Sequence, residues 1–195
     1  MRSRAKALLT RVFADPVARL LARTGVTPNA LTLMGLGLSA AAAVLLGLGY
    51  IFSGGAVLLV AGLFDVLDGA LARVSGRASR FGALLDSTVD RVAEAVVFFG
   101  LTWYFLTRNE ELGVMLAYAA LVGSLLVSYV RARAEGLGVP GEVGIAARPE
   151  RVVLLALGLL TGLVVPALAL VSLLAFITAG QRLAYAGRRT REPAP

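Results

Sequence analysis

The chain has 195 residues and contains neither cysteine nor histidine. These two absences exclude thiol catalysis, disulfide bonds, histidine-dependent triads and the usual zinc sites. If the protein needs a general base, that base must be a carboxylate, with Lys6 or a tyrosine as a weaker alternative. Without cysteines, the sequence also carries no information about the redox state of its compartment.

Charged residues are scarce as well. They make up 16% of the chain, while 58% of the residues are hydrophobic; in soluble domains about a quarter of the residues are charged. This composition predicts an all-α integral membrane protein with one compact domain. We expect residues 1–25 to form an amphipathic juxtamembrane segment, residues 26–187 a six-helix membrane domain, and residues 188–195 a disordered basic tail.

Lysine and arginine outnumber acidic residues by 19 to 12, and their positions matter more than their number. They gather within residues 2–23, 73–80, 131–151 and 182–191. Arg108 is the one basic residue in the connections that would lie on the other side of the membrane. Basic clusters that flank apolar spans mark the cytoplasmic side of a membrane protein. The pattern therefore predicts a multi-pass protein of the cytoplasmic membrane with both termini in the cytoplasm. Its partners are expected to be membrane lipids and not nucleic acid.

Six membrane-spanning helices are expected after an N-terminal interfacial helix. Residues 2–14 carry an apolar stripe opposite basic side chains, which predicts an amphipathic helix on the membrane surface. Thr27 and Pro28 predict the start of the first span, with the threonine as N-cap. The expected spans cover residues 28–50, 56–73, 81–105, 112–130 and 152–179, the last divided in two near Val165 and Pro166, with an external turn at residues 53–55.

Two pairs of aspartates interrupt this apolar sequence. Asp65 and Asp68 are three residues apart, and Asp86 and Asp90 are four apart, so each pair lies on one face of its helix. Asp68 precedes Arg73 by five residues and Asp86 follows Phe81 by five. At ~1.5 Å per residue both lie roughly 7–8 Å from the connecting loop, so the two pairs should face each other. Carboxylates at membrane depth are usually functional, and four of them predict an all-oxygen site for Mg²⁺.

The acids belong to a longer pattern, Asp65-x2-Asp68-Gly69-x2-Ala72-Arg73-x8-Gly82-x3-Asp86-x3-Asp90. This pattern resembles the signature of the CDP-alcohol phosphotransferases, integral membrane enzymes that attach an alcohol to a phospholipid and displace CMP. The resemblance implies two Mg²⁺ ions, which Mn²⁺ can replace, held by Asp65, Asp68 and Asp86, with Asp90 joining the second ion and acting as the base. It also implies a homodimer. The residues expected to contact CDP-diacylglycerol are Asn29, Thr32, Asp68, Gly69, Ala72, Arg73, Ser79 and Gly82.

A second group of arginines indicates the acceptor. Arg131, Arg133, Arg148 and Arg151 should converge at the cytoplasmic ends of the fourth and fifth spans, where they could clamp a phosphate. The alternative is that they only set the topology. Residues 128–135 and 144–151 are similar to stretches of the enzymes that make phosphatidylinositol phosphate, with arginine at position 131 in place of lysine and alanine at position 147 in place of glutamate. This resemblance implies transfer of the phosphatidyl group to inositol phosphate.

Two further interpretations remain open. Glycerol 3-phosphate could be the acceptor, giving phosphatidylglycerol phosphate, or the lipid could be an archaeal equivalent used in the same chemistry. A Mg²⁺ transporter would also explain paired acids within the membrane. Conduction, however, needs polar residues along the whole pore, and the external halves of the expected spans are apolar. The enzyme interpretation is therefore favoured.

Overall fold

The structure is a computed structural model that describes residues 14–141 and 143–190. The described residues are α-helical with short connections and contain no β-strand. A helical segment covers residues 14–23, and the labelled helices are α2 (Pro28–Gly47), α3 (Ile51–Val74), α4 (Arg80–Leu106), α5 (Glu111–Gly136), α6 (Arg148–Leu160) and α7 (Val164–Arg189). The interfacial helix expected over residues 2–14 lies outside the described residues apart from its last position. α7 extends two residues into the expected C-terminal tail, whose residues 191–195 also lie outside the described part.

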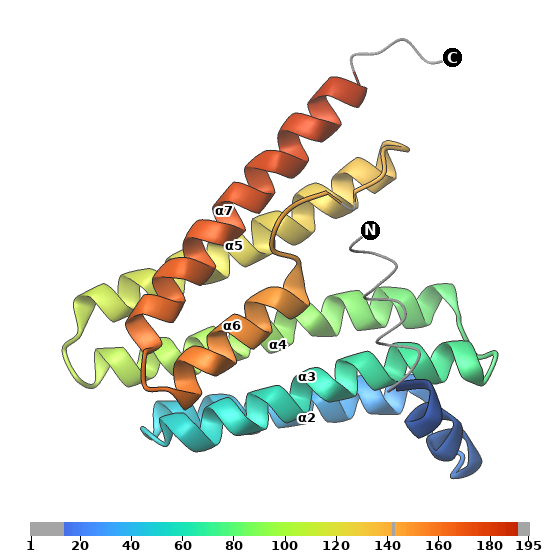
Figure 1. The fold of residues 1–195 in the computed structure, drawn as a ribbon, viewed down its shortest axis with the longest axis horizontal. Helices are drawn as coiled ribbons and strands as arrows, with labels where there is room; N and C mark the ends of the chain where they lie inside the picture. Colours follow the sequence, from blue (N-terminus) through green and yellow to red (C-terminus); the bar gives the residue numbers. More distant parts are fainter. Residues whose placement is uncertain (1–13, 142, 191–195) are drawn as a thin grey trace.

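The helices form two packed groups that share α4 and α6. α2 packs against both α3 and α4, whereas α5 packs against α7 and α4. The short α6 lies between α3 and α7 and joins the two groups. Figure 1 shows α2 and α3 side by side along one edge, and α5 and α7 running together toward the other.

Two helix starts near the aspartates are fixed by hydroxyl caps. The Thr27 hydroxyl accepts a hydrogen bond from the Ala30 amide at 3.2 Å, and Pro28 occupies the first turn of α2, so the predicted start of this helix is confirmed. The Ser79 hydroxyl accepts from the Gly82 amide at 2.9 Å and caps α4.

The prediction of an external turn at residues 53–55 is wrong. The chain reverses at residues 48–50, where Gly49 has a φ of +92°, and Gly54 and Gly55 lie inside α3. A Cβ added at Gly54 would lie 2.6 Å from the Leu46 side chain, and one at Gly55 would lie 2.7 Å from the Leu159 Cβ. The two glycines therefore permit close helix packing and do not form a turn.

The break between the last two helices, which was expected near Pro166, lies earlier in the chain. α6 ends at Leu160 and α7 begins at Val164, and the turn between them uses Gly162 at a φ of +75°. Pro166 lies in the first turn of α7. Proline is tolerated there because the amide that it lacks would have no acceptor within the helix.

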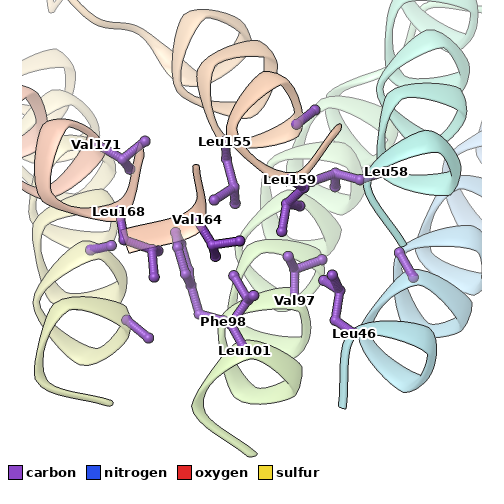
Figure 2. Close-up of a cluster of buried hydrophobic side chains, with 14 of the residues drawn as sticks. Leu46, Leu58, Val97, Phe98, Leu101, Leu155, Leu159, Val164, Leu168 and Val171 are labelled. Carbon is purple, nitrogen blue, oxygen red and sulfur yellow. The ribbon is translucent and has the colours of Figure 1, made fainter. Parts of the chain in front are cut away.

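The largest of the three hydrophobic clusters in the described residues fills the half of the molecule that contains the turns at residues 48–50, 107–110 and 161–163. Its buried side chains come from α2 through α7 and pack across both helix groups (Figure 2). The labelled members are Leu46, Leu58, Val97, Phe98, Leu101, Leu155, Leu159, Val164, Leu168 and Val171. The aspartates lie in the other half of the helices, beyond this core.

Among the described residues, four helices are long and apolar enough to cross a membrane: α2, α3, α5 and α7. α4 does not meet these criteria, because even its most apolar stretch of 18 residues, 89–106, contains three charged residues, Asp90, Arg91 and Glu94. α6 has 13 residues, about 20 Å at the helical rise, whereas a bilayer core is about 30 Å thick. The structure therefore agrees with an all-α membrane protein, and four of the six expected spans meet the criteria of length and composition.

α6 is short because the segment before it runs along α7. The Ala146 amide donates to the Thr178 hydroxyl and the Ile145 amide to the Gln181 side chain, each at 3.2 Å. The Arg182 Nε donates to the Val143 carbonyl at 2.7 Å. Thr178 lies about 21 Å along α7 from its first residue at the helical rise. Irregular backbone at such depth needs internal partners, and α7 provides them. α6 consequently begins at the level of the aspartates.

Candidate active site

Three aspartates converge where α3 faces α4. One carboxylate oxygen each from Asp65, Asp86 and Asp90 lie within 4.8 Å of one another, and all three residues are half-buried. The helical spacing and the antiparallel hairpin predicted this approach. The arrangement concentrates negative charge at one point between two apolar helices.

Asp68, the fourth aspartate, is turned toward α2. It is buried, and its Oδ2 accepts a hydrogen bond from the Thr32 hydroxyl at 2.7 Å. The group of three carboxylates within 4.8 Å does not include it. The structure thus brings Thr32 and Asp68 together, as expected for two residues of one binding face, while Asp68 borders the cluster from the side.

Arg148 from the start of α6 reaches into the carboxylate cluster. Its Nη1 lies 2.6 Å from Asp65 Oδ1 and 2.7 Å from Asp90 Oδ1, so a positive group already stands between the two acids. Asp86 Oδ1 is buried and makes no hydrogen bond with the residues that the structure describes. An all-oxygen donor set with an unsatisfied carboxylate oxygen suits a hard divalent cation, so these residues fit a Mg²⁺ or Mn²⁺ site.

The next arginine of α6 is buried and paired with an acid that the sequence analysis missed. Arg151 is only 2% exposed, its Nη2 lies 2.9 Å from Glu94 Oε1, and its Nη1 donates to the Ala146 carbonyl at 3.2 Å. Glu94 is also buried. It follows Asp90 by four residues, so the i, i+4 spacing within an apolar run was the signal that could have identified it.

Arg182 of α7 is another residue whose role the sequence analysis missed, because it counted this arginine only as a topological charge. Its side chain is buried and its Nη1 donates to the Val127 carbonyl at 2.8 Å. Arg182 and Arg151 donate to carbonyls of the same loop, Arg182 from Nε to Val143 at 2.7 Å and Arg151 from Nη1 to Ala146 at 3.2 Å. Arg131 also donates from Nε to Glu135 at 2.8 Å, and Arg133 is exposed at the end of α5. Of the four arginines expected at the acceptor, Arg148 and Arg151 lie beside the acids.

The residues expected to contact a nucleotide lie near the start of α2, the end of α3 and the start of α4. A Cβ added at Gly82 would lie 3.0 Å from the Ser79 hydroxyl and 3.3 Å from Asn29 Oδ1, so these three residues adjoin. A Cβ added at Gly69 would have Arg73 Nη1 as its nearest neighbour, at 3.6 Å. Arg73 therefore folds back over Gly69, where the α3 backbone is open to a ligand. Ala72, on the following turn, is half-buried.

A cavity of about 210 Å³ connects the charged cluster with the apolar interior. Its polar end is lined by Thr32, Asp65, Asp68, Asp90, Glu94, Arg148 and Arg151. The remainder runs between α2, α3, α4 and α6 along side chains such as Leu36, Leu58 and Val152. A cavity with one charged end and an apolar remainder suits an amphiphilic ligand.

Comparisons with known sequences agree with this geometry. The family model for CDP-alcohol phosphatidyltransferase matches residues 25–182. The archaetidylinositol phosphate synthase of Methanothermobacter thermautotrophicus is 38% identical over 147 residues, 72% of this chain and 73% of that protein. The phosphatidylinositol phosphate synthase of Mycobacterium tuberculosis is 44% identical over 110 residues, which cover 55% of this chain and half of that sequence.

Solved structures cover more of the chain than the sequence matches do. The phosphatidylinositol phosphate synthase of Mycobacterium tuberculosis with CDP-DAG bound superposes with a TM-score of 0.80 at 37% identity, over 89% of this chain and 93% of that one. The same mycobacterial protein in complex with manganese and citrate gives a TM-score of 0.81 at 36% identity, over 90% and 89% of the two chains.

Proposed function

The chain belongs to the CDP-alcohol phosphatidyltransferase family, and we propose that it transfers the phosphatidyl group of CDP-diacylglycerol to inositol phosphate and releases CMP. The observation that carries this proposal is the cavity in which Arg148 pairs with Asp65 and Asp90 and Arg151 pairs with Glu94. Guanidinium groups beside a cluster of acids suit a phosphorylated acceptor at a phosphoryl-transfer centre. The names of the sequence relatives and of the superposed structure support inositol phosphate as that acceptor.

We expect Asp65, Asp68, Asp86 and Asp90 to hold two Mg²⁺ ions, with Mn²⁺ able to replace them. Support comes from the three converging carboxylates, the unsatisfied Asp86 oxygen and the manganese in a superposed structure. When bound, such ions neutralise charge on the pyrophosphate and on the departing CMP.

The chain's own residues bind both substrates and move one proton. Asp90 is the general base and accepts the proton of the acceptor hydroxyl, whose oxygen forms a new bond to the phosphatidyl phosphorus while the bond to CMP breaks. Asp68 and Thr32, joined by their hydrogen bond, adjoin the donor. The remaining donor contacts are Asn29, Gly69, Ala72, Arg73, Ser79 and Gly82.

The acceptor phosphate lies among Arg131, Arg133, Arg148 and Arg151. Arg182, which is buried and bonded to the same loop as Arg151, adds positive charge to this region. Guanidinium groups can bind a phosphate through charge-assisted, bidentate hydrogen bonds, which a neutral alcohol does not offer, and this favours a phosphorylated substrate. Glycerol 3-phosphate is the main alternative acceptor, and an archaeal CDP-lipid is the alternative donor because one relative is named an archaetidylinositol phosphate synthase.

In the membrane, α2 to α7 are six spans of a homodimeric protein of the cytoplasmic membrane, preceded by an interfacial helix. The spans include α4 and α6 because each packs between helices that are themselves long enough to cross. Both termini and the active site face the cytoplasm, in accordance with the basic residues at the α3–α4 loop and at the end of α7.

One assay tests the reaction class and the acceptor together. Purified protein in lipid nanodiscs is given Mg²⁺ and either CDP-diacylglycerol or its archaeal ether analogue, and CMP release is measured with inositol phosphate, glycerol 3-phosphate and free inositol. We expect fastest release with inositol phosphate and little with free inositol. Faster release with glycerol 3-phosphate would favour the alternative acceptor. Mg²⁺ flux without acceptor-dependent release of CMP would favour a transporter.

A further inference from the structure

α4 carries three acids on one face, of which only two belong to the sequence signature. Asp86, Asp90 and Glu94 are spaced by four residues, so they lie one above another along the helix. α6 presents two arginines one turn apart, and the pairs follow the same order: Arg148 with Asp90 at 2.7 Å, and Arg151 with Glu94 at 2.9 Å. Of these two ion pairs between α4 and α6, the pair of Arg151 and Glu94 is the more deeply buried.

The deeper pair is shielded from solvent on both sides. Arg151 is 2% and Glu94 7% exposed. Removing one member of such a pair leaves the other charge buried without compensation, whereas an exposed ion pair contributes little. Arg151 also donates to the Ala146 carbonyl, just before the first residue of α6. Two contacts thus fix its guanidinium relative to α4 and to the loop along α7.

One nitrogen of the Arg151 guanidinium group has no hydrogen-bond partner among the described residues. This nitrogen is Nε, which is buried. Glu94 and Arg151 line the same cavity as Asp90 and Arg148. The contacts through Nη1 and Nη2 therefore hold the guanidinium of Arg151 in place at the cavity wall.

We infer that Glu94 is the positioning residue for the acceptor phosphate, acting through Arg151. Its carboxylate holds the Arg151 guanidinium at the cavity wall and keeps it from pairing with Asp90, the neighbouring acid of the same face. This inference rests on the proposed function, because it assumes that the cavity receives a phosphorylated acceptor. Glu94 touches neither substrate and makes its contribution through the geometry of one arginine.

The test distinguishes a specific loss of acceptor binding from a general loss of folding or activity. Glu94→Gln keeps the shape of the side chain and removes its charge, Glu94→Asp keeps the charge and shortens the side chain, and Glu111→Gln removes the same charge at the exposed start of α5. Losing a charge-assisted contact to Arg151 should raise the KM for inositol phosphate about tenfold in Glu94→Gln. The KM for CDP-diacylglycerol and kcat should stay within about twofold of wild type. Glu94→Asp should recover part of the loss, and Glu111→Gln should behave as wild type.

A double-mutant cycle tests the route through Arg151. In an Arg151→Gln background, adding Glu94→Gln should leave the acceptor KM unchanged, because the group that Glu94 positions is gone. A further rise in the double variant, equal rises in both KM values, or an unchanged acceptor KM in Glu94→Gln would overturn the inference. If Glu94→Gln does not fold, an acceptor KM for Glu94→Asp equal to that of wild type would overturn it as well.

A substrate-independent measurement distinguishes failure of the inference from failure of the proposed function. Inorganic phosphate should raise the Tm of wild-type protein in nanodiscs, and it should raise the Tm of Glu94→Gln, or of Glu94→Asp if the first does not fold, much less. If wild type transfers no phosphatidyl group to any phosphorylated alcohol, the proposed function fails, and this phosphate response alone decides the role of Glu94. Equal stabilisation of variant and wild type by phosphate would overturn the inference even if the enzyme is active.

Discussion

At the scale of residues, the candidate site is a balance between carboxylates and guanidinium groups. Five acids from α3 and α4 gather around the cavity and its border: Asp65, Asp68, Asp86, Asp90 and Glu94. Three arginines face them, since Arg91 lies 3.8 Å from Asp90 in addition to the ion pairs of Arg148 and Arg151. The excess of negative charge within an apolar bundle favours the binding of further cations. This preference is why a divalent metal belongs in the proposed mechanism.

The first prediction concerns these acids. Asp65→Asn and Asp86→Asn should each abolish transfer and weaken Mn²⁺ binding, because each removes a charged oxygen ligand from a small all-oxygen site. Asp90→Asn should lower kcat by ~10²–10⁴-fold as the general base is lost. Mn²⁺ binding is measured by electron paramagnetic resonance of protein in nanodiscs, and transfer is measured as CMP release.

EDTA should stop the reaction of the wild type, and added Mg²⁺ should restore it. Glu111→Gln is the control for loss of one negative charge, since this residue lies exposed at the other end of the bundle. Full activity in EDTA, or in both Asp65→Asn and Asp86→Asn, would contradict the proposed metal site.

Sequence spacing predicted the converging aspartates because that feature depends only on helix geometry and a short loop. It did not predict the partners of Arg148 and Arg151, because those contacts join residues far apart in the chain. Asp65 and Arg148, for example, are 83 positions apart. Glu94 was overlooked because it lies beyond the family signature, although its spacing from Asp90 already marked it. Arg182 matched the positive-inside pattern, and that pattern concealed its burial.

At the scale of elements, α6 is the helix that makes the site possible. Its start depends on the loop that Thr178, Gln181 and Arg182 hold against α7. Gly144 within this loop has a φ of +128°, and a Cβ there would collide with the Thr178 side chain. The side chains of α7 thereby set the position of Arg148 beside Asp65 and Asp90.

The second prediction concerns the contact between α2 and α4. A Cβ at Gly100 would lie 2.8 Å from the Ala43 Cα, so Gly100→Ala must push the two backbones apart. Overpacking of this kind should cost about 1–3 kcal/mol of stability. Gly37→Ala is the matched control, because a Cβ at this exposed helical position meets nothing within 4 Å.

The free energies of unfolding of both variants are measured in mixed micelles by titration with denaturing detergent. Gly37→Ala should be neutral or up to about 1 kcal/mol more stable, because alanine is the better helix former. Equal stability of the Gly100→Ala and Gly37→Ala variants would show that α2 and α4 are not packed as closely as described.

Glycines also explain why the turns were harder to predict than the helices. A pair of glycines after an apolar run is typical of a turn, yet Gly54 and Gly55 pack against Leu46 and Leu159 inside α3. The sequence alone cannot distinguish these uses, because the second requires knowledge of the partner helix. Gly162 does form a turn, and Pro166, which was expected to mark it, lies within the first turn of α7.

At the scale of the whole molecule, the two halves of the bundle have different chemistry. The half with the loops at 48–50, 107–110 and 161–163 contains the buried core of Figure 2. The other half holds the aspartates, the arginines and the polar end of the cavity. The helices of both groups run between these halves (Figure 1). This division predicts that the charged half faces the cytoplasm, where a water-soluble phosphorylated acceptor and CMP can exchange.

The last prediction tests this orientation with single cysteines, for which the chain offers a background free of native thiols. Ala78→Cys and Leu137→Cys mark the loops of the charged half, and Glu110→Cys and Thr161→Cys mark exposed positions of the opposite loops. A membrane-impermeant maleimide applied to intact cells should label the cysteines at 110 and 161 and should reach those at 78 and 137 only after permeabilisation. Each variant must retain CMP release. Labelling at position 78 without permeabilisation would place the aspartates on the outer side of the membrane. Protection at position 161 would show that the turn between α6 and α7 does not reach the outer side, and would contradict the six-span topology.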